Sequence, residues 1–294
     1  MFQLKTGYLF TGIVTGLILL GSIFTSLPDG KLHIVFCDVG QGDGAYVRFP
    51  DGRDMVVDGG PNDKILGCLG KYMPFWDREI DIVVLTHPQK DHMQGLLSIL
   101  ERYDVGYFVH SDIVNATEGF AKLRDILNTK KIAERLVTRG ERIAIGEATL
   151  SVIWPSADQI AMMNPELSNV LSASSVDLND GSVVFWLRHG SFDTLFTGDA
   201  DNRVNGSFIG SPLADDSIEL LKVPHHGSKT GMTEQFLAWL KPKMAIISVG
   251  KNSYGHPTRE VLELLARYNS VIHRTDESGD IEVVSDGKTW EVVR

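Results

Sequence analysis

Residues 80–92, "IDIVVLTHPQKDH", join an apolar run directly to a group of residue types that bind metals. The first seven, "IDIVVLT", are almost continuously apolar, which predicts a strand buried on both faces of a sheet. The apolar residues that follow have helical spacing, so the polar stretch in between is expected to form a strand-to-helix loop. His87, Asp91 and His92 lie within six residues of one another on that loop. A divalent metal requires such a compact set of ligands and core packing does not, so the stretch predicts a metal site.

Strand-like and helix-like segments alternate along the chain on both sides of this stretch. Residues 45–50 and 54–58 are β-rich and flank a "PDGR" turn, which predicts a hairpin, and residues 142–145 and 148–154 predict a second one. Residues 155–180 show no firm pattern, which is typical of a functional or mobile loop. The other expected strands are 32–37, 105–110, 182–190, 193–199, 218–224, 243–250, 270–275, 280–285 and 288–293, and the other expected helices are 119–132, 233–240 and 258–268.

The first part of the chain, residues 1–29, differs from the rest in composition. Residues 7–27 are 21 positions without a charge, enough for a helix that crosses a bilayer. Lys5 is the only basic residue before them, which favours a single-pass membrane protein with its body outside the cytoplasm. A cleaved signal peptide, which would make the protein secreted, is the alternative, but no clear Ala-x-Ala site precedes Pro28. No linker divides residues 30–294, which are expected to form one domain.

Net charge and cysteine content narrow the classes of partner. The formal net charge is -10 and the isoelectric point is about 5.3, which weighs against general, non-specific attraction to nucleic acid or to an acidic membrane. The two cysteines, Cys37 and Cys68, specify no disulfide framework and lack the spacing of a metal site. An exported domain could pair them, but Cys37 lies in a strand pattern and is expected to be an inert buried thiol.

Four further polar clusters follow expected strands. They are Asp58 with two glycines after it, "TGDA" with Asp199, "VPHHGS" with His225 and His226, and "YGHP" with His256. Loops at one edge of a sheet converge, so these residues are expected to meet the first cluster. Asp58 or Asp199 alone could be a turn residue. Together the clusters form a ligand set rich in oxygen and free of thiolate, which favours Mn²⁺ or Mg²⁺, while the imidazoles leave Zn²⁺ open.

These motifs carry a family resemblance. "THPQKDH" resembles the His-x-His-x-Asp-His signature of the metallo-β-lactamase superfamily, with "VVDGG" before it and "TGD" after it in the usual order. More narrowly, "DVGQGD", "NDGS" and "KVPHHGS" resemble the metallo-β-lactamase domain of ComEC-type competence proteins, which form a DNA-uptake channel. The resemblance runs from about Leu32 to the carboxyl end, and the multi-helix channel of a ComEC protein is missing. It implies an α/β (α+β) fold, the four-layer αββα sandwich. The uncharged run 7–27 is expected to add one N-terminal transmembrane helix before it.

The resemblance also assigns site residues to one or two divalent ions. Gln89 departs from the pattern, because the superfamily usually has His there and competence-type members often have Asp; a neutral amide binds a cation more weakly than either. By the resemblance, the metal ligands are His87, Asp91, His92, Asp199 and His225, with His226 as the alternative to His225 for the later ligand. The supporting or weak ligands are Asp58, Gln89, Asn179 and Asp180.

The resemblance implies a membrane-anchored, extracytoplasmic, metal-dependent phosphodiesterase or nuclease that acts on DNA during uptake, with a channel protein as a possible partner. The metal would lower the pKa of a water molecule, so that hydroxide attacks phosphorus without a side-chain nucleophile. Asp91 would orient the hydroxide, one of His225, His226 and His256 would protonate the leaving oxygen, and Ser228 and Lys229 would contact a phosphate.

Two other functions stay open. The domain could hydrolyse small phosphoesters, thioesters or lactams, which the superfamily also cleaves. Because Gln89 weakens one ligand position, it could instead be a non-catalytic module that binds DNA or another component of an uptake system.

Overall fold

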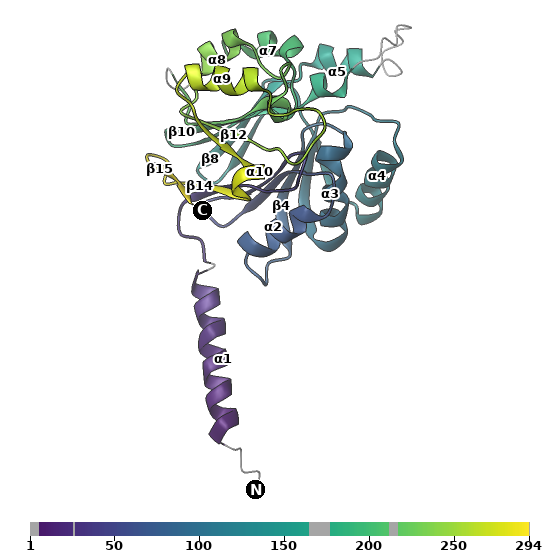
Figure 1. The fold of residues 1–294 in the computed structure, drawn as a ribbon. Coiled ribbons are helices and arrows are strands. Elements are labelled where there is room, and N and C mark those ends of the chain that lie inside the picture. The colour runs from purple at the N-terminus through teal and green to yellow at the C-terminus, as the bar shows by residue number, and fades with distance from the viewer. Residues whose placement is uncertain (1–5, 26, 165–176, 212–216, 294) are drawn as a thin grey trace.

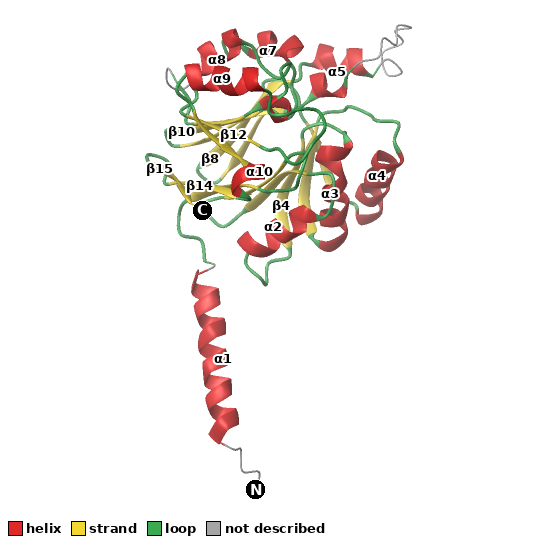
Figure 2. Ribbon diagram, viewed as in Figure 1, coloured by secondary structure: helices red, strands yellow, loops and turns green. Residues whose placement is uncertain are grey.

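Two sheets pack face to face between two layers of helices (Figure 1; Figure 2). The computed structural model describes residues 6–25, 27–164, 177–211 and 217–293. The eight-stranded sheet has the order β15-β14-β1-β2-β3-β4-β5-β6, and the seven-stranded sheet has the order β13-β12-β11-β10-β9-β8-β7. The expected mixed α/β sandwich of two sheets is therefore confirmed.

The strands of the first sheet are β1 Leu32–Phe36, β2 Gly44–Arg48, β3 Asp54–Gly59, β4 Glu79–Leu85, β5 Asp104–His110, β6 Ala133–Leu136, β14 Ile281–Ser285 and β15 Trp290–Val293. Those of the second are β7 Arg142–Ile145, β8 Ala148–Trp154, β9 Val184–His189, β10 Phe192–Phe196, β11 Leu220–Lys222, β12 Met244–Ile247 and β13 Val271–Arg274. The helices are α1 Thr6–Thr25, α2 Lys64–Tyr72, α3 Lys90–Arg102, α4 Glu118–Lys130, α5 Ala157–Met163, α7 Asn202–Phe208, α8 Glu234–Leu240, α9 Arg259–Arg267 and α10 Thr275–Ser278.

Strand β4 shows why the opening stretch is apolar at almost every position. Ile82 and Val84 face the core between the two sheets, and Val83 and Leu85 face the helices on the outer side. A strand in the middle of a four-layer sandwich is covered on both faces, so the two-residue alternation of a half-exposed strand disappears. The prediction from the sequence is confirmed, as are the hairpins β2–β3 and β7–β8.

Parallel pairing brings the polar clusters to one edge of the sandwich. Strand β3 pairs in parallel with β4, and β10, β11, β12 and β13 pair in parallel with one another. Parallel neighbours end on the same side, so the loops after these strands converge on a single rim. Each of the clusters built on Asp58, His87, Asp199, His226 and His256 lies in such a loop or at such a strand end.

Some local expectations were wrong. Helix α3 begins at Lys90, so Asp91 and His92 belong to its first turn and not to a loop. The segment 155–180 contains α5 and a 3₁₀ turn at Leu178–Gly181, and its central part, 165–176, lies outside the described residues. Elements α2, α5, α7 and β6 had no prediction because they are short.

Cys37 is not a free thiol: it forms a disulfide with Cys68, with 5.9 Å between the two Cα atoms. Cys37 directly follows β1, and Cys68 lies on the buried face of α2, which packs on the outer side of the same sheet. The expectation of an inert buried thiol failed because α2 was not predicted, so nothing in the sequence placed the second cysteine beside the first.

Helix α1 stands apart from the sandwich (Figure 1). Within the part of the chain that the structure describes, no helix combines the length and apolar character needed to cross a membrane.

The disulfide should contribute measurably to stability, because its ends are 31 residues apart in sequence. Closing a loop of that length in the unfolded chain corresponds to about 3 to 4 kcal/mol of stabilisation. We expect a reductant to lower the free energy of unfolding in urea by an amount of this order. The double variant Cys37→Ser/Cys68→Ser should be insensitive to the reductant, and two titratable thiols in the unfolded, non-reduced protein would contradict the pairing.

Candidate metal centre

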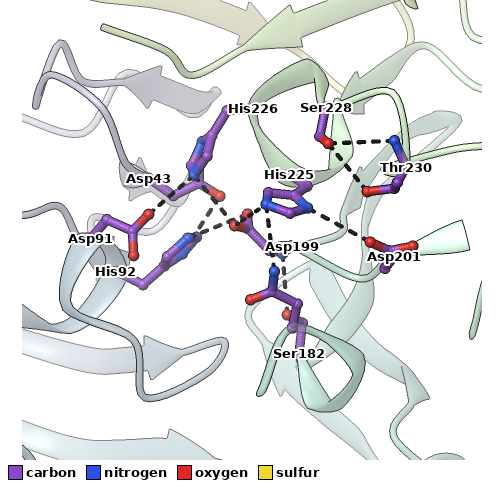
Figure 3. A network of polar contacts seen from close by, with 12 residues as sticks. Asp43, Asp91, His92, Ser182, Asp199, Asp201, His225, His226, Ser228 and Thr230 are labelled. Carbon is purple, nitrogen blue, oxygen red and sulfur yellow. Dashed lines mark hydrogen bonds and ion pairs between the residues drawn. The ribbon is translucent and has the colours of Figure 1, made fainter. Parts of the chain in front are cut away.

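The carboxylate of Asp199 lies at the centre of the converging loops (Figure 3). Its Oδ1 is 3.3 Å from Nε2 of His92, and its Oδ2 is 3.3 Å from Nε2 of His226. Asp91 completes the group, with Oδ2 3.5 Å from the same nitrogen of His226. One ligand atom from each of these four residues lies within 4.8 Å of the others. Two imidazoles and two carboxylates at this separation match the donor set of a divalent metal such as Zn²⁺ or Mn²⁺.

Unsatisfied buried atoms test whether a metal fits this group. Nε2 of His92, Nε2 of His226 and Oδ1 of Asp199 are buried and have no hydrogen-bond partner. Such atoms are rare in folded proteins because each costs desolvation energy. A cation that binds them explains why three such atoms occur on neighbouring residues of one group, so the residues fit a metal.

The pKa values of both histidines indicate the same demand for positive charge. Burial opposes a charged ring, but the carboxylates of Asp199, Asp58 and Asp43 raise the pKa of His92 well above its usual value. Burial also opposes charge on His226, and Asp199 and Asp43 raise its pKa in the same way. Without a metal, protons supply the charge that the carboxylates require; a divalent ion supplies it when bound.

Asp58 holds His92 in the orientation that a ligand needs. It is fully buried in a left-handed backbone conformation (φ 57°), and its Oδ2 is 2.8 Å from Nδ1 of His92. Its two oxygens also accept hydrogen bonds from the amide and the hydroxyl of Thr86. A carboxylate on the far nitrogen of a ligand histidine sets the tautomer and the ring plane. Asp58 is therefore a support and lies outside the four-residue group.

Asp43 and Lys222 form an ion pair within the centre that the sequence had not indicated. Both are buried; Nζ of Lys222 contacts Oδ2 of Asp43 and donates to the carbonyl of Gly198 at 2.9 Å. Lys222 is also 3.7 Å from Oδ1 of Asp199, and Oδ1 of Asp43 is 3.2 Å from Nδ1 of His226. The same nitrogen of His226 lies 2.9 Å from the carbonyl oxygen of Ser248. The carbonyl of Ser248 thus orients His226 as Asp58 orients His92, and Asp43 adds a negative charge beside the same nitrogen.

Both residues lie in quoted motifs, "DVGQGD" and "KVPHHGS", which were the available signal. Neither was assigned a role because Asp43 follows a glycine-rich turn and Lys222 ends an apolar strand. Burial of a lysine at a strand end is a property of the packed sheets and is not visible in the sequence.

His87 lies beside the four-residue group at a second, poorer position. Burial lowers its pKa to about 3, so the ring is neutral, and its Nε2 has no hydrogen-bond partner. Its ring centroid is 4.1 Å from that of His92, and Nδ1 is 3.2 Å from the hydroxyl of Ser182. Oδ1 of Asn179 is also buried without a partner. Gln89, half-buried at the N-cap of α3, adds no charge. Apart from the carboxylate of Asp199, which both positions could share, the position around His87 therefore offers only neutral donors.

The remaining predicted residues lie outside the group. His225, assigned as a ligand from the sequence, has Nε2 4.0 Å from Oδ2 of Asp199 and 3.5 Å from the amide of Asn179, whereas its neighbour His226 lies within the group. His256 has its ring centroid 5.6 Å from that of His225. The side chains of the other three point elsewhere: Asp180 pairs with Arg203, Ser228 contacts the hydroxyl of Thr230, and Lys229 is exposed.

Comparison with known proteins identifies a family and several relatives with similar sequences. The family model described as "Metallo-beta-lactamase superfamily" matches residues 37–251. The chain is 27% identical over 278 residues to "ComE operon protein 3" of Bacillus subtilis, covering 86% of this chain and 33% of that protein. It is 27% identical over 267 residues to "Recombination protein 2" of Haemophilus influenzae, covering 89% and 30%. "Competence protein ComA" of Neisseria gonorrhoeae is 25% identical over 259 residues, covering 87% and 33%. The chain thus spans about a third of the length of these relatives.

Solved structures share the fold at low identity. The metallo-β-lactamase fold protein YhfI from Bacillus subtilis matches with a TM-score of 0.56 and 12% identity, over 87% of this chain and 100% of that one. Zn²⁺-bound PqqB from Methylobacterium extorquens matches with a TM-score of 0.52 and 14% identity, over 82% and 97%. These likenesses support the architecture alone.

Measuring the metal content of variants should show which of the adjacent histidines, His225 or His226, binds the metal. We expect His226→Ala and Asp199→Ala to lower metal affinity at least about a hundredfold, because each removes a donor, and Asp58→Asn to lower it about 10- to 100-fold through ring orientation. His225→Ala should retain the metal. Plasma mass spectrometry and titration with Mn²⁺ and Zn²⁺, with circular dichroism as a control for folding, measure this. Equal metal loss in His225→Ala and His226→Ala would contradict the assignment.

Proposed function

The chain belongs to the metallo-β-lactamase superfamily, and from this premise we propose that it is a metal-dependent phosphodiesterase that cleaves DNA. The observation that carries the proposal is the group of Asp91, His92, Asp199 and His226, three of them buried and one open to solvent. The side chain of Asp91 is 33% exposed, so a substrate reaches the centre past it. The superfamily consists generally of metal-dependent hydrolases, which agrees with this arrangement.

DNA as the substrate is supported by the relatives. Two of them are named competence or recombination proteins, and a third is named after the ComE operon. The phosphodiesterase would act on DNA during DNA uptake, next to a channel protein. Because the chain spans about a third of those proteins, the activity and partners of the whole relatives come to it only as this proposal.

A bound ion and the side chains of the protein would have different roles in hydrolysis. A divalent ion bound by the four residues would lower the pKa of water and polarise a phosphoryl oxygen. The chain supplies the geometry: Asp58 and the carbonyl of Ser248 hold the two ligand imidazoles, and Lys222 balances the charge of Asp43. One ligand atom from each of the four residues already lies within 4.8 Å of the others, and fixed groups of this kind are what electrostatic catalysis requires.

His225 is the residue placed to donate a proton to the leaving oxygen. It is at the mouth of the centre, with its side chain 23% exposed and Nδ1 3.8 Å from Oδ2 of Asp201. Asp201 thus lies beside one ring nitrogen of His225, and the other ring nitrogen, Nε2, faces Asp199 and the centre. His256, the other candidate, has its pKa lowered by burial and by the neighbouring histidines, so it is mainly neutral at pH 7.

A non-catalytic DNA-binding module is the second candidate, favoured by one observation. The position around His87 offers few charged donors, with Gln89 and Asn179 as neutral amides. If hydrolysis required two ions, this position would limit it. Replacing Gln89 by Asp adds a charged ligand, and activity gained only in that variant would favour the module.

We also propose that residues 7–27 hold the protein at a membrane with the sandwich outside the cytoplasm. The uncharged run of 21 residues supports attachment, and the disulfide supports an oxidising compartment, since paired cysteines are rare in reducing cytosol.

Activity should depend on the metal and on the leaving group. With Mn²⁺, we expect wild-type protein to cleave oligodeoxynucleotides and Asp199→Asn to lose at least about a thousandfold in rate. His225→Ala should lose about 10²- to 10³-fold on DNA, whose alkoxide needs a proton, and much less on a p-nitrophenyl phosphodiester, whose phenolate does not. The variant His33→Gln, which removes an imidazole outside the centre, serves as the control for these rates. An equal loss on both substrates would contradict the proton-donor role.

Membrane attachment is tested on the whole chain. We expect the protein to remain with membranes in alkaline carbonate and to dissolve in detergent. The exposed helix residues Ile13 and Leu17 allow a charged variant, Ile13→Asp/Leu17→Asp, which should move to the soluble fraction because acidic side chains are costly in hydrocarbon. A soluble wild-type protein would overturn this part of the proposal.

A further inference from the structure

One strongly exposed aromatic side chain lies on the rim of the metal centre. Tyr254 is 73% exposed and belongs to the loop 250–257 between β12 and α9. The loop is held by Asn252, whose Oδ1 accepts hydrogen bonds from the amides of Tyr254 and His256 at 3.0 and 3.1 Å. Its Nδ2 donates to the carbonyls of Gly250 and His256, both at 2.8 Å. Tyr254 is therefore presented to solvent by a backbone that is already ordered.

Both ends of this loop are joined to the elements of the centre. The amide of Gly250 donates to Oε1 of Gln41 at 3.3 Å, and a Cβ at position 250 would lie 2.4 Å from the carbonyl carbon of Gly40. At the other end, the amide of Thr258 donates to the carbonyl of Gly227, which follows His226. The position of Tyr254 relative to the metal ligands is thus set by direct contacts.

A series of rings leads from this tyrosine to the carboxylate at the centre. The ring centroid of Tyr254 is 5.7 Å from that of His256, with planes 30° apart, and His256 is 5.6 Å from His225. His225 in turn approaches Asp199 at 4.0 Å, as Figure 3 shows. These successive contacts place Tyr254 on the same rim as the metal ligands.

We propose that Tyr254, backed by His256, is a stacking subsite for an unpaired nucleobase next to the scissile phosphate. The inference rests on the proposed phosphodiesterase function and names its substrate more closely, as single-stranded nucleic acid. A base in a duplex is covered on both faces by its neighbours, so an exposed ring on a fixed loop can engage only a base that is unstacked.

The charge of the protein supports this mode of binding. At a net charge of -10 the molecule repels a polyanion at long range, so affinity must come from local contacts. Stacking on an aromatic ring is such a contact, since it depends little on ionic strength and every base has a face to offer. The exposed Lys251, next to Asn252 in the loop, adds a local positive charge for the backbone.

Binding is tested separately from cleavage, on the full-length protein with Ca²⁺ in place of Mn²⁺. The probes are fluorescein-labelled twelve-nucleotide oligothymidylate and a strand of the same length made of abasic tetrahydrofuran units, followed by anisotropy. The variants are Tyr254→Ala, Tyr254→Phe, and Tyr107→Ala, which removes an exposed tyrosine of β5.

We expect Tyr254→Ala to weaken oligothymidylate binding about tenfold, while Tyr254→Phe and Tyr107→Ala stay within about twofold of wild type. The abasic strand should bind wild type and Tyr254→Ala equally, because only a base engages the ring. Equal loss on both strands, or no loss on either, would overturn the stacking subsite.

Cleavage by Mn²⁺-loaded wild type keeps the two proposals distinct. If oligothymidylate is cleaved but Tyr254 makes no base-dependent difference, the subsite is wrong and the phosphodiesterase stands. If the base-dependent difference is found but no strand is cleaved, the subsite stands and the hydrolytic function is wrong.

Discussion

The structure depends on four carboxylates gathered at one edge of a sandwich. Asp43, Asp58 and Asp199 are buried and Asp91 is half-buried, so their charges are removed from most of the water that would otherwise screen them. Unpaired charges in such a place are costly in free energy, so the surrounding groups compensate them. Lys222 neutralises Asp43, the imidazoles approach Asp199, and the unsatisfied ligand atoms that remain need a cation.

The fold supplies these contacts by joining distant parts of the chain. Asp43 comes from the loop after β1, and the disulfide between Cys37 and Cys68 ties the start of that loop to α2. His226 and Lys222 come from the second sheet, about 180 residues later, and meet Asp43 across the rim. Since each ligand ring is held through its far nitrogen, the site is as rigid as the strand ends that carry it. The loop that carries Tyr254 is fixed to the same strand ends, which couples substrate position to the metal ligands.

The fold, and the placement of Asp91, His92 and Asp199 at one rim, could be predicted from the sequence because their signals are local. A run such as 80–86 is apolar at nearly every position only if both faces are covered, and polar residues directly after such runs mark a rim. The reasoning failed where the cause is not local. Cys37 was taken for a free thiol because α2, which carries its partner, has only nine residues and was not predicted. The start of α3 was placed too late because its first turn is made of ligands in place of apolar residues.

By itself, the sequence determined the layers, the strand ends that bear polar clusters, and the residue types of the metal centre, because hydrophobic period and motif spacing are properties of neighbouring residues. Only the tertiary structure decided between His225 and His226. Both lie in the left-handed region, with φ of 50° and 53°, and neighbouring side chains there point in different directions. The structure likewise revealed Asp43 and Lys222, since a buried ion pair between two sheets exists only once the sheets have packed. Which atoms meet is decided by packing, and packing depends on contacts far apart in the chain.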